Sequence, residues 1–328
     1  MKNLKRVLWI FFAAALTTGF YACADDDETD PVTPPAATGP TQNIAEIALG
    51  DSRTDSLVVA LSEANLVSIF QGSGTFTVFA PTNQAFVDLL ATDPNWNRIS
   101  DIDATTLTNV LLYHVMGSKV MSGDLTDDTY AITLNERAPQ SDEYTVIEVD
   151  VTGGVTLNNS ANVTAADIEA TNGVIHIIDE VLLPANIVDI ALDDERFTSL
   201  VAALSRFGTT YTGILSGTGP FTVFAPTNDA FQALLDSDPT WNTLNDIPQT
   251  TLEAVLDYHV IVGSNNRAGD LTQNQVLTTR STRTLSVSLI NGRQLITSSS
   301  TQGNVDIIVT DVQGTNGVIH AVDQVLLP

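Results

Sequence analysis

The sequence predicts two tandem domains that each combine α-helices with β-strands. A stretch of strand-forming residues, a proline and a helix start occurs at 75–86 and again at 220–231, with ten of twelve residues identical. The chain has 328 residues, which suits two domains of about 140 residues each better than one core. Hydrophobic residues make up 43%, as expected of a folded chain. We place the domains at 43–184 and 186–328.

The repeated stretch predicts a strand, a break and a helix. Its first half is rich in β-branched and aromatic residues, which favour a half-buried strand. Pro81 cannot donate to a sheet ladder and should end the strand. Thr82 or Asn83 is placed to cap the following helix. Because the chain reverses at the proline, we expect Phe79 and Phe86 to enter the same core. Their counterparts in the second repeat are Phe224 and Phe231.

Caps and periodicity predict the other elements. Asn43 can cap a short helix at 44–48, and apolar spacing predicts one amphipathic helix over 56–70. Asp103 can cap a helix that leads to Tyr113. The pair Asn291-Gly292 predicts a two-residue hairpin turn within 285–296. Alternating residues predict further strands at 130–134, 144–149 and 174–181, the last with alternate residues pointing inward.

The charge of the chain limits its partners. It carries 39 acidic and 13 basic residues, a net charge of −26. Such a surface repels nucleic acid and anionic lipid headgroups. Solvation of an acidic surface is the simplest interpretation. Calcium capture is the alternative, but the sequence lacks the Asp-rich loop with a central glycine that is typical of EF-hands.

Residues 1–22 have the three parts of a secretory signal peptide: a basic end, an apolar segment and small residues. The apolar segment is shorter than the about 20 residues that a spanning helix needs. Ala22 and Cys23, the single cysteine of the chain, resemble the cleavage box of bacterial lipoproteins, in which the cysteine is lipidated. An ordinary secretory signal followed by a free cysteine is the alternative.

Residues 23–42 are predicted to form a tether. Four consecutive acids at 25–28 would be repelled by an anionic membrane surface. They also resemble the export tag of lipoproteins that reach the outer face of the outer membrane, with plain solvation as the alternative. Residues 29–42 are rich in proline and threonine, which predicts a semi-extended spacer. Only Ala185 separates the two domains, which suggests restricted motion between them.

Three motifs together resemble those of the fasciclin-like domain family. They are the stretch at 75–86, the Tyr-His pair at 113–114 and the run from Asn-Gly-Val-Ile-His to Leu-Leu-Pro at 172–184. All three return in the same order in the second domain, at 220–231, 258–259 and 316–328. The resemblance implies an α+β fold, in which each domain is a wedge of mostly antiparallel strands with packed helices. It also implies adhesion modules at the cell surface and not enzymes.

The resemblance further implies ligand-binding residues. In animal members of the family, an Asp-Ile pair before the third motif and the region around Tyr-His take part in receptor recognition. The alternative is that these side chains pack in the core. In the first domain the matching residues are Asp167, Ile168, Tyr113 and His114. In the second domain they are Asp311, Val312, Tyr258 and His259, where valine replaces the isoleucine of the pair.

The histidines and two of the tryptophans could bind a ligand, but the sequence supports a structural role for them. The four histidines are repeat-equivalent and could join Asp179 or Asp323 in a metal site. Tight ligand spacing is missing, so we expect hydrogen-bonded core histidines and no metal or other cofactor. Trp96 and Trp241 could stack on sugar rings, although packing at a helix–loop junction is more common. The sequence contains no established catalytic motif, so we expect no enzyme.

These observations predict a lipid-anchored, two-domain adhesion protein at the outer membrane or cell surface. Its partner would be a protein or polysaccharide of cells, matrix or polymer, and not nucleic acid. The alternative function is a glycan-binding surface lipoprotein. Exposed tryptophans beside a groove would favour that alternative, and buried tryptophans would favour adhesion.

Overall fold

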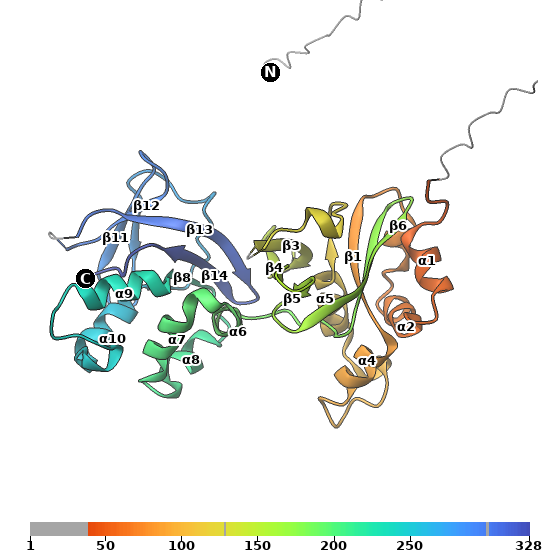
Figure 1. The fold of residues 1–328 in the computed structure, drawn as a ribbon, viewed down its shortest axis with the longest axis horizontal. Coiled ribbons are helices and arrows are strands. Elements are labelled where there is room, and N and C mark those ends of the chain that lie inside the picture. Colours follow the sequence, from red (N-terminus) through yellow and green to blue (C-terminus); the bar gives the residue numbers. More distant parts are fainter. Residues whose placement is uncertain (1–38, 128, 300–301) are drawn as a thin grey trace, which may run out of the picture. The chain divides into compact units, whose positions relative to one another are not determined.

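A computed structural model of the chain describes residues 39–127, 129–299 and 302–328 (Figure 1), and Gly39–Pro328 forms one compact unit. The predicted signal peptide, Cys23 and most of the tether lie outside the described residues. Among the residues that are described, none belongs to a helix long and apolar enough to cross a membrane.

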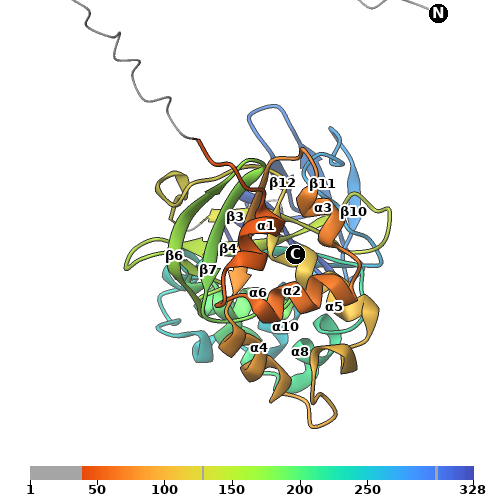
Figure 2. The ribbon, with the colours of Figure 1, turned by 90° about the vertical axis from the view of Figure 1, so that its right-hand side faces the viewer.

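The first domain consists of helices packed against a seven-stranded sheet. Its α-helices are α1 (Ile44–Gly50), α2 (Asp55–Glu63), α3 (Val67–Gln71), α4 (Asn83–Leu90) and α5 (Ala104–Tyr113), with short 3-10 turns η1 (Ile99–Asp101) and η2 (Ser122–Asp124). Its strands are β1 (Phe76–Pro81), β2 (Val115–Met116), β3 (Thr129–Glu136), β4 (Tyr144–Asp150), β5 (Thr156–Leu157), β6 (Ala161–Ala170) and β7 (Gly173–Ile178). Helix α1 lies beside α2 and against β7 (Figure 2).

The second domain repeats this order of elements around its own seven-stranded sheet. Its helices are α6 (Ile187–Asp193), α7 (Thr198–Ser205), α8 (Thr209–Leu215), α9 (Asn228–Asp236) and α10 (Gln249–Tyr258), with η3 (Glu195–Phe197) and η4 (Leu244–Asp246). Its strands are β8 (Phe221–Pro226), β9 (Val260–Val262), β10 (Val276–Thr278), β11 (Thr284–Ser288), β12 (Gln294–Ile296), β13 (Val305–Gly314) and β14 (Gly317–Val322).

Both sheets have the same topology. The strand order is β2-β1-β7-β6-β5-β4-β3 in the first domain and β9-β8-β14-β13-β12-β11-β10 in the second. The central pairs β1–β7 and β8–β14 are parallel. The other pairs described in both sheets are antiparallel. The predicted α+β class, with mostly antiparallel strands and packed helices, is therefore confirmed.

The central strands are buried on both faces, which corrects two predictions. Side chains alternate along a strand, so Val78 and Ala80 of β1 join the core between sheet and helices, which we call the helix-side core. Phe79 points the other way, into a far-side core lined by β4 and β5. Phe86 of α4 lies in the helix-side core, so the prediction that both rings share one core is wrong. All six residues of β7 are buried, and not only alternate ones.

The predicted helix caps are largely confirmed. Asn43 caps α1 in a reciprocal capping box with Glu46, and Asp103 caps α5. Of the two candidates in the repeated stretch, Thr82 caps α4 by accepting from the Ala85 N–H at 3.2 Å. Asn83 instead joins this turn to the start of α2. Its side chain accepts from the N–H of Ser56 and donates to the carbonyl of Ser52.

Two other local predictions are wrong. The expected single helix over 56–70 is broken into α2 and α3, because Asn65 has a φ of 56° and ends α2. The hairpin β11–β12 closes through residues 289–293 and not through two residues. Gly292 has a φ of 109°, whereas a two-residue turn of the predicted type needs positive φ at both central residues.

The third motif joins the beginning of each domain to its end. The Asn172 side chain accepts from the Ile44 N–H at the start of α1 and donates to the carbonyls of Phe70 and Gly72. Gly173 follows with a φ of 154°, and a Cβ there would lie 2.0 Å from the Phe76 carbonyl oxygen. Only glycine permits this approach of β7 to β1. The pair Asn316-Gly317 makes the same contacts in the second domain.

The two domains contact each other near the start of the second. The Tyr130 hydroxyl of β3 donates to Asp194 Oδ2 at 2.5 Å, and the Arg196 guanidinium lies 5.3 Å from the centroid of the Tyr130 ring. Val146 of β4 packs into the helix-side core of the second domain. Asp194 is only 2% exposed, since Tyr130 and Arg196 cover its carboxylate.

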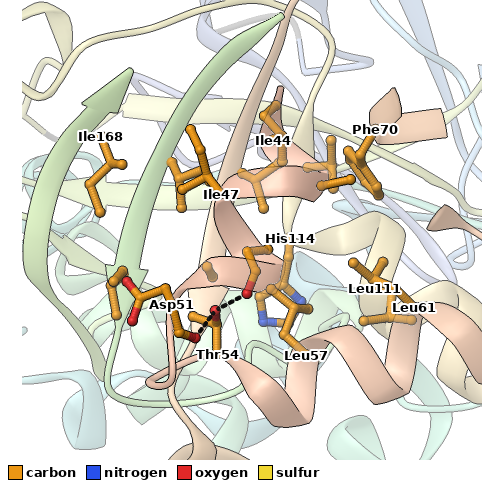
Figure 3. A pocket seen from close by; sticks show the side chains of 17 residues that line it. Ile44, Ile47, Asp51, Thr54, Leu57, Leu61, Phe70, Leu111, His114 and Ile168 are labelled. Atoms are coloured by element: carbon orange, nitrogen blue, oxygen red, sulfur yellow. Dashed lines mark hydrogen bonds between the residues drawn. The ribbon is translucent and has the colours of Figure 1, made fainter. Parts of the chain in front are cut away.

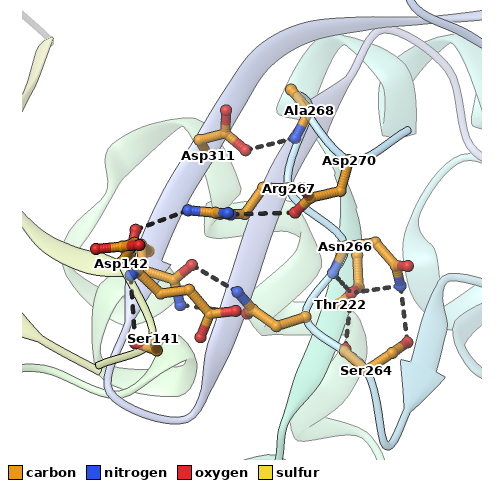
Figure 4. A network of polar contacts seen from close by, with 12 residues as sticks. Ser141, Asp142, Thr222, Ser264, Asn266, Arg267, Ala268, Asp270 and Asp311 are labelled. Atoms are coloured by element: carbon orange, nitrogen blue, oxygen red, sulfur yellow. Dashed lines mark hydrogen bonds and ion pairs between the residues drawn. The ribbon is translucent and has the colours of Figure 1, made fainter. Parts of the chain in front are cut away.

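A second contact joins two loops (Figure 4). Arg267 donates to the carbonyl oxygen of Asp142 at 2.7 Å and pairs with the Asp270 carboxylate at 3.1 Å. One arginine thus bridges a loop of the first domain and a loop of the second. We expect these contacts, together with the single-residue joint, to restrict motion between the domains.

Phe79→Ala should lower the free energy of unfolding of the first domain by about 3–5 kcal/mol, because the buried ring would leave a cavity. Val87→Ala is the control, since Val87 is 55% exposed and a surface change of this kind costs less than about 0.5 kcal/mol. Denaturant titration followed by circular dichroism measures both. We expect the second domain to stay folded, because Phe224 fills the matching place in its own core. One transition displaced as a whole would show that the two domains unfold as one unit.

Candidate functional site

A narrow apolar pocket with a cavity volume of about 20 Å³ lies between α1, α2 and the helix-side face of the first sheet (Figure 3). Apolar side chains supply most of the wall, among them Ile44, Ile47, Leu57, Leu61, Phe70 and Ile175. At its edge, the Thr54 hydroxyl donates to the carbonyls of Ala48 and Asp51. The wall is therefore mostly apolar, and the free space inside it is about that of one water molecule.

Two of the sequence-predicted binding residues meet at this pocket. His114 comes from the Tyr-His pair at the end of α5, and Ile168 comes from the Asp-Ile pair in β6. Ile168 is half-buried and lies opposite Ile175 of β7. The resemblance links two motifs to receptor recognition, and each of them thus contributes one side chain to this pocket. Tyr113 and Asp167 point elsewhere.

His114 is a structural link within the pocket wall. Its Nε2 accepts from the Leu182 N–H at 2.9 Å, so the proton lies on Nδ1, which donates to the Val110 carbonyl at 2.7 Å. These bonds hold the C-terminal segment of the domain against α5. Burial in apolar surroundings lowers the pKa of His114 to about 4. The ring is therefore neutral at physiological pH.

Tyr113 faces the far-side core and is 1% exposed. Its hydroxyl donates to the Val146 carbonyl at 2.7 Å and accepts from the Asn158 amide at 3.1 Å. Burial raises the pKa of Tyr113 to about 12. The ring anchors β4 and β5 to α5, and in this structure it has almost no surface for a ligand.

Asp167 holds a loop against the sheet. It occupies an irregularity in β6 with a φ of 60°, a conformation that aspartate tolerates better than most residues. Its carboxylate accepts from the N–H and the hydroxyl of Ser122 at 2.7 and 2.5 Å, and these bonds lower its pKa. Its own N–H donates to Nδ1 of His176 at 3.2 Å. About 35% of the side chain remains exposed.

The second domain repeats this arrangement with differences. Tyr258 and His259 are buried, and His259 bonds to Val255 and Leu326 as its counterpart does in the first domain. Asp311 has a φ of 61° and accepts from the Ala268 N–H at 2.7 Å. Val312 is fully buried. A pocket with a cavity volume of about 60 Å³ lies between α6, α7 and the sheet, but neither His259 nor Val312 is among its lining residues.

The histidines have no free nitrogen for a metal. His176 uses Nδ1 as an acceptor from Asp167 and Nε2 as a donor to the Val120 carbonyl at 3.0 Å. His320 makes the same two kinds of bond. Within the described ranges, no three histidine, cysteine or acidic side chains are grouped as metal ligands. Trp96 and Trp241 are half-buried and pack against the helix-side cores.

Sequence reasoning missed the partners that position these residues. Ser122, which fixes the Asp167 carboxylate, is 45 positions away in the chain. Leu182, which fixes His114, is 68 positions away. The bond from Leu182 is repeated by Leu326 in the second domain, whereas Ala268 repeats only the N–H bond of Ser122. The repeat itself was the available signal.

The chain is similar to proteins of one family. The model of the fasciclin domain matches residues 52–184 and 195–328. Transforming growth factor-beta-induced protein ig-h3 of Sus scrofa is 30% identical over 267 residues, which cover 79% of this chain. Those residues cover 35% of ig-h3, so the chain spans about a third of that relative.

Two further matches are more limited. Protein sll1735 of Synechocystis, described as uncharacterized, is 40% identical over 141 residues, covering 43% of this chain and 97% of that protein. A solved FAS1 domain pair from the insect cell adhesion molecule fasciclin I covers 87% of this chain and 96% of its own, with 20% identity and a TM-score of 0.47.

The buried histidines predict a loss of stability in mild acid. The pKa of His114 and of His259 is about 4 in the fold, against 6.5 for an unperturbed ring. The unfolded chain therefore binds more protons between these values, so stability is full above pH 6.5 and falls as the pH drops toward 4. At pH 5 each domain should lose about 2 kcal/mol through this histidine. Urea titrations at pH 7 and pH 5 measure the difference.

The control for this prediction is the titration of the histidine rings themselves. Asp51 and Asp167 have lowered pKa values, so their contribution falls below pH 3.8 and outside the window. The ring-proton NMR shifts of His114 and His259 should stay constant from pH 7 to pH 5. Titration of either ring near pH 6.5 would contradict the buried, neutral state.

Proposed function

The chain belongs to the fasciclin domain family, and we propose on that basis that it is a surface-anchored adhesion protein. Its two domains would bind cells, extracellular matrix or polymer. The observation that carries this proposal is the match of the fasciclin model to both halves of the chain, 52–184 and 195–328. Adhesion modules of this family act by binding, so we infer that the chain is not an enzyme.

We infer that the accessible part of the recognition region is the Asp167-Ile168 pair of the first domain. Asp167 exposes about a third of its side chain, and Ile168 is half-buried beside the apolar pocket. Tyr113 and His114 lie beneath the surface and hold the surrounding elements in place. Val312 of the second domain is fully buried, which supports a smaller role for its Asp-Val pair.

The alternative function, glycan binding, depends on the tryptophans. Trp96 and Trp241 occupy equivalent loops and keep part of their surface exposed. Both rings pack against a helix-side core, which supports a packing role and favours adhesion through protein contacts. Retention on a glycan array, lost in Trp96→Ala, would support the alternative.

We further propose that Cys23 carries a lipid that anchors the chain to the outer membrane or cell surface. The signal-like residues 1–22 and the acidic, proline-rich stretch that follows Cys23 support this proposal. The net charge of −26 supports a partner other than nucleic acid and contact with the membrane through the lipid alone.

Cys23→Ser should release the chain from the membrane fraction. Acyl chains contribute about 0.8 kcal/mol per buried CH₂, so several chains on one cysteine hold a protein firmly. Fractionation and immunoblotting of cells that express wild type or variant measure the distribution, and Ser52→Ala is a control that leaves Cys23 intact. A variant that partitions with membranes to the wild-type extent would disprove the lipid anchor.

Asp167→Asn should weaken adhesion at least about tenfold, the usual cost of losing a hydrogen bond to a charged group. Asparagine tolerates the positive φ, so the backbone should be unchanged. Beads coated with the full chain are tested for retention on immobilised matrix proteins, with Asp311→Asn in the second domain as the matched control. Equal loss in both variants would argue against a special role for the first domain, and absence of retention by wild type would argue against adhesion to matrix.

A further inference from the structure

Three Asn-Gly pairs occur in the chain, at 172–173, 291–292 and 316–317. Asparagine is chemically labile when glycine follows it, because glycine has no Cβ to shield its backbone nitrogen. That nitrogen can then reach the side-chain carbonyl carbon of the asparagine. The reaction depends on how firmly the fold holds the amide and the glycine, and the three pairs differ in this respect.

Two of the pairs are locked inside their domains. Asn172 and Asn316 are 4% and 5% exposed. Each side chain accepts a hydrogen bond from the N–H at the start of a helix and donates to two carbonyls. Gly173 and Gly317 begin β7 and β14, where a Cβ would lie 2.0 and 2.5 Å from a carbonyl oxygen of the neighbouring strand. Neither the amide nor the glycine is therefore free to turn toward the other.

The third pair lies at the tip of the hairpin between β11 and β12. Asn291 and Gly292 are both exposed, and a Cβ on Gly292 would have open space around it. Among the residues that the structure describes, the Asn291 side chain has no hydrogen-bond partner. The strand pairing ends at Ser288 and Gln294, so the pair lies in the loop 289–293, outside the ladder. Here the amide is free to rotate toward the glycine nitrogen.

We propose that Asn291 is a site of spontaneous modification, at which its amide is replaced by a carboxylate. The Gly292 nitrogen gives its proton to hydroxide from the solvent and attacks Cγ of Asn291. A C–N bond forms, the bond from Cγ to the amide nitrogen breaks, and that nitrogen takes up a proton and leaves as ammonia. Water then opens the five-membered imide at either of its carbonyls. The products are aspartate and isoaspartate, and in isoaspartate the main chain runs through the side-chain carboxyl carbon.

The hairpin can accept either product. The Leu289 N–H donates to the side-chain oxygen of Gln273 at 2.6 Å, and the Arg293 Nε donates to the Ala268 carbonyl at 3.2 Å. These bonds fix the loop at both ends, so the additional main-chain carbon of isoaspartate is absorbed between them. Conversion of Asn291 breaks no side-chain bond to the described residues, so the second domain should stay folded.

The modification changes the chemistry of the hairpin tip. Ile290 is 77% exposed and Leu289 is 38% exposed. Before the reaction, two aliphatic side chains and a neutral amide form the tip. Afterwards a carboxylate stands next to Ile290, in a chain that already carries a net charge of −26. A partner that covered these aliphatic side chains would also have to accommodate the charge, which is costly to bury unpaired.

Incubation of the purified full chain in mildly alkaline buffer tests the proposal. Peptide mapping by mass spectrometry measures the amide that remains at each of the three asparagines, and an isoaspartyl methyltransferase labels the isoaspartate. Asn291 should react at least about a hundredfold faster than Asn172 and Asn316, since either of those must first break three hydrogen bonds. In denaturant, which removes these bonds, all three should react at similar rates.

Three outcomes of this experiment would overturn the proposal. The first is an Asn291 amide that survives in the folded chain as long as the amides of Asn172 and Asn316. The second is equal loss at all three sites in the folded chain, because the fold would then not select Asn291. The third is slow reaction of Asn172 and Asn316 in denaturant, because their local sequence and not the fold would then protect them.

Variants isolate the residue. Asn291→Gln keeps an amide but adds one carbon to the side chain, so the five-membered ring cannot form, and the backbone there has no positive φ that would exclude glutamine. During incubation wild type should gain a more acidic species on anion exchange, and Asn291→Gln should not. Asn97→Gln, at an exposed asparagine that no glycine follows, is the matched control and should gain this species as wild type does. Asn291→Asp should elute with the acidic species from the beginning. An acidic species that forms in Asn291→Gln to the wild-type extent would place the reaction elsewhere and overturn the proposal.

Discussion

The burial of the parallel pair β1–β7 on both faces is the constraint on which each domain depends. Residues of β1 and β7 alternate between the helix-side core and the far-side core, so the two strands tie both cores together. All residues of these strands except the half-buried Phe76 are buried. We therefore expect ligand-binding residues around this strand pair, on the bulged strand β6, on the loop held by Ser122 and at the edges of α1 and α2.

The sequence alone was sufficient for those elements whose determinants are local. Asn43, Thr82 and Asp103 act as caps because each needs only a neighbour three residues away. The prediction of one helix over 56–70 is wrong at Asn65. The apolar spacing continues through this residue, but its backbone adopts a left-handed conformation that ends α2. Phe79 lies in the far-side core because side chains alternate along β1. The reversal of the chain at Pro81 suggests instead that Phe79 and Phe86 share one core, and this prediction is wrong.

The candidate site was predictable only in part. His114 and Ile168 come from different motifs, and nothing in their separate surroundings shows that they line one pocket. The buried state of the histidines followed from their places beside apolar strands. The pairing of Tyr130 with Asp194 and Arg196 was not accessible in this way, because it joins an edge strand to a helix end 64 positions away. Such contacts depend on the packing of one folded domain against another, which local sequence patterns do not encode.

The hydrogen bond between Asn172 and Ile44 has a consequence for the order of folding. The two residues are 128 positions apart, and the same bond in the second domain spans 129. Helix α1 is made first, yet its leading N–H finds its partner only when the last hairpin of the domain is in place. Each domain thus closes late, on a contact of long loop length, which is typical of slow folding. During synthesis, the N–H of Ile44 at the start of α1 therefore has no Asn172 side chain to bond with until the ribosome has added the turn between β6 and β7.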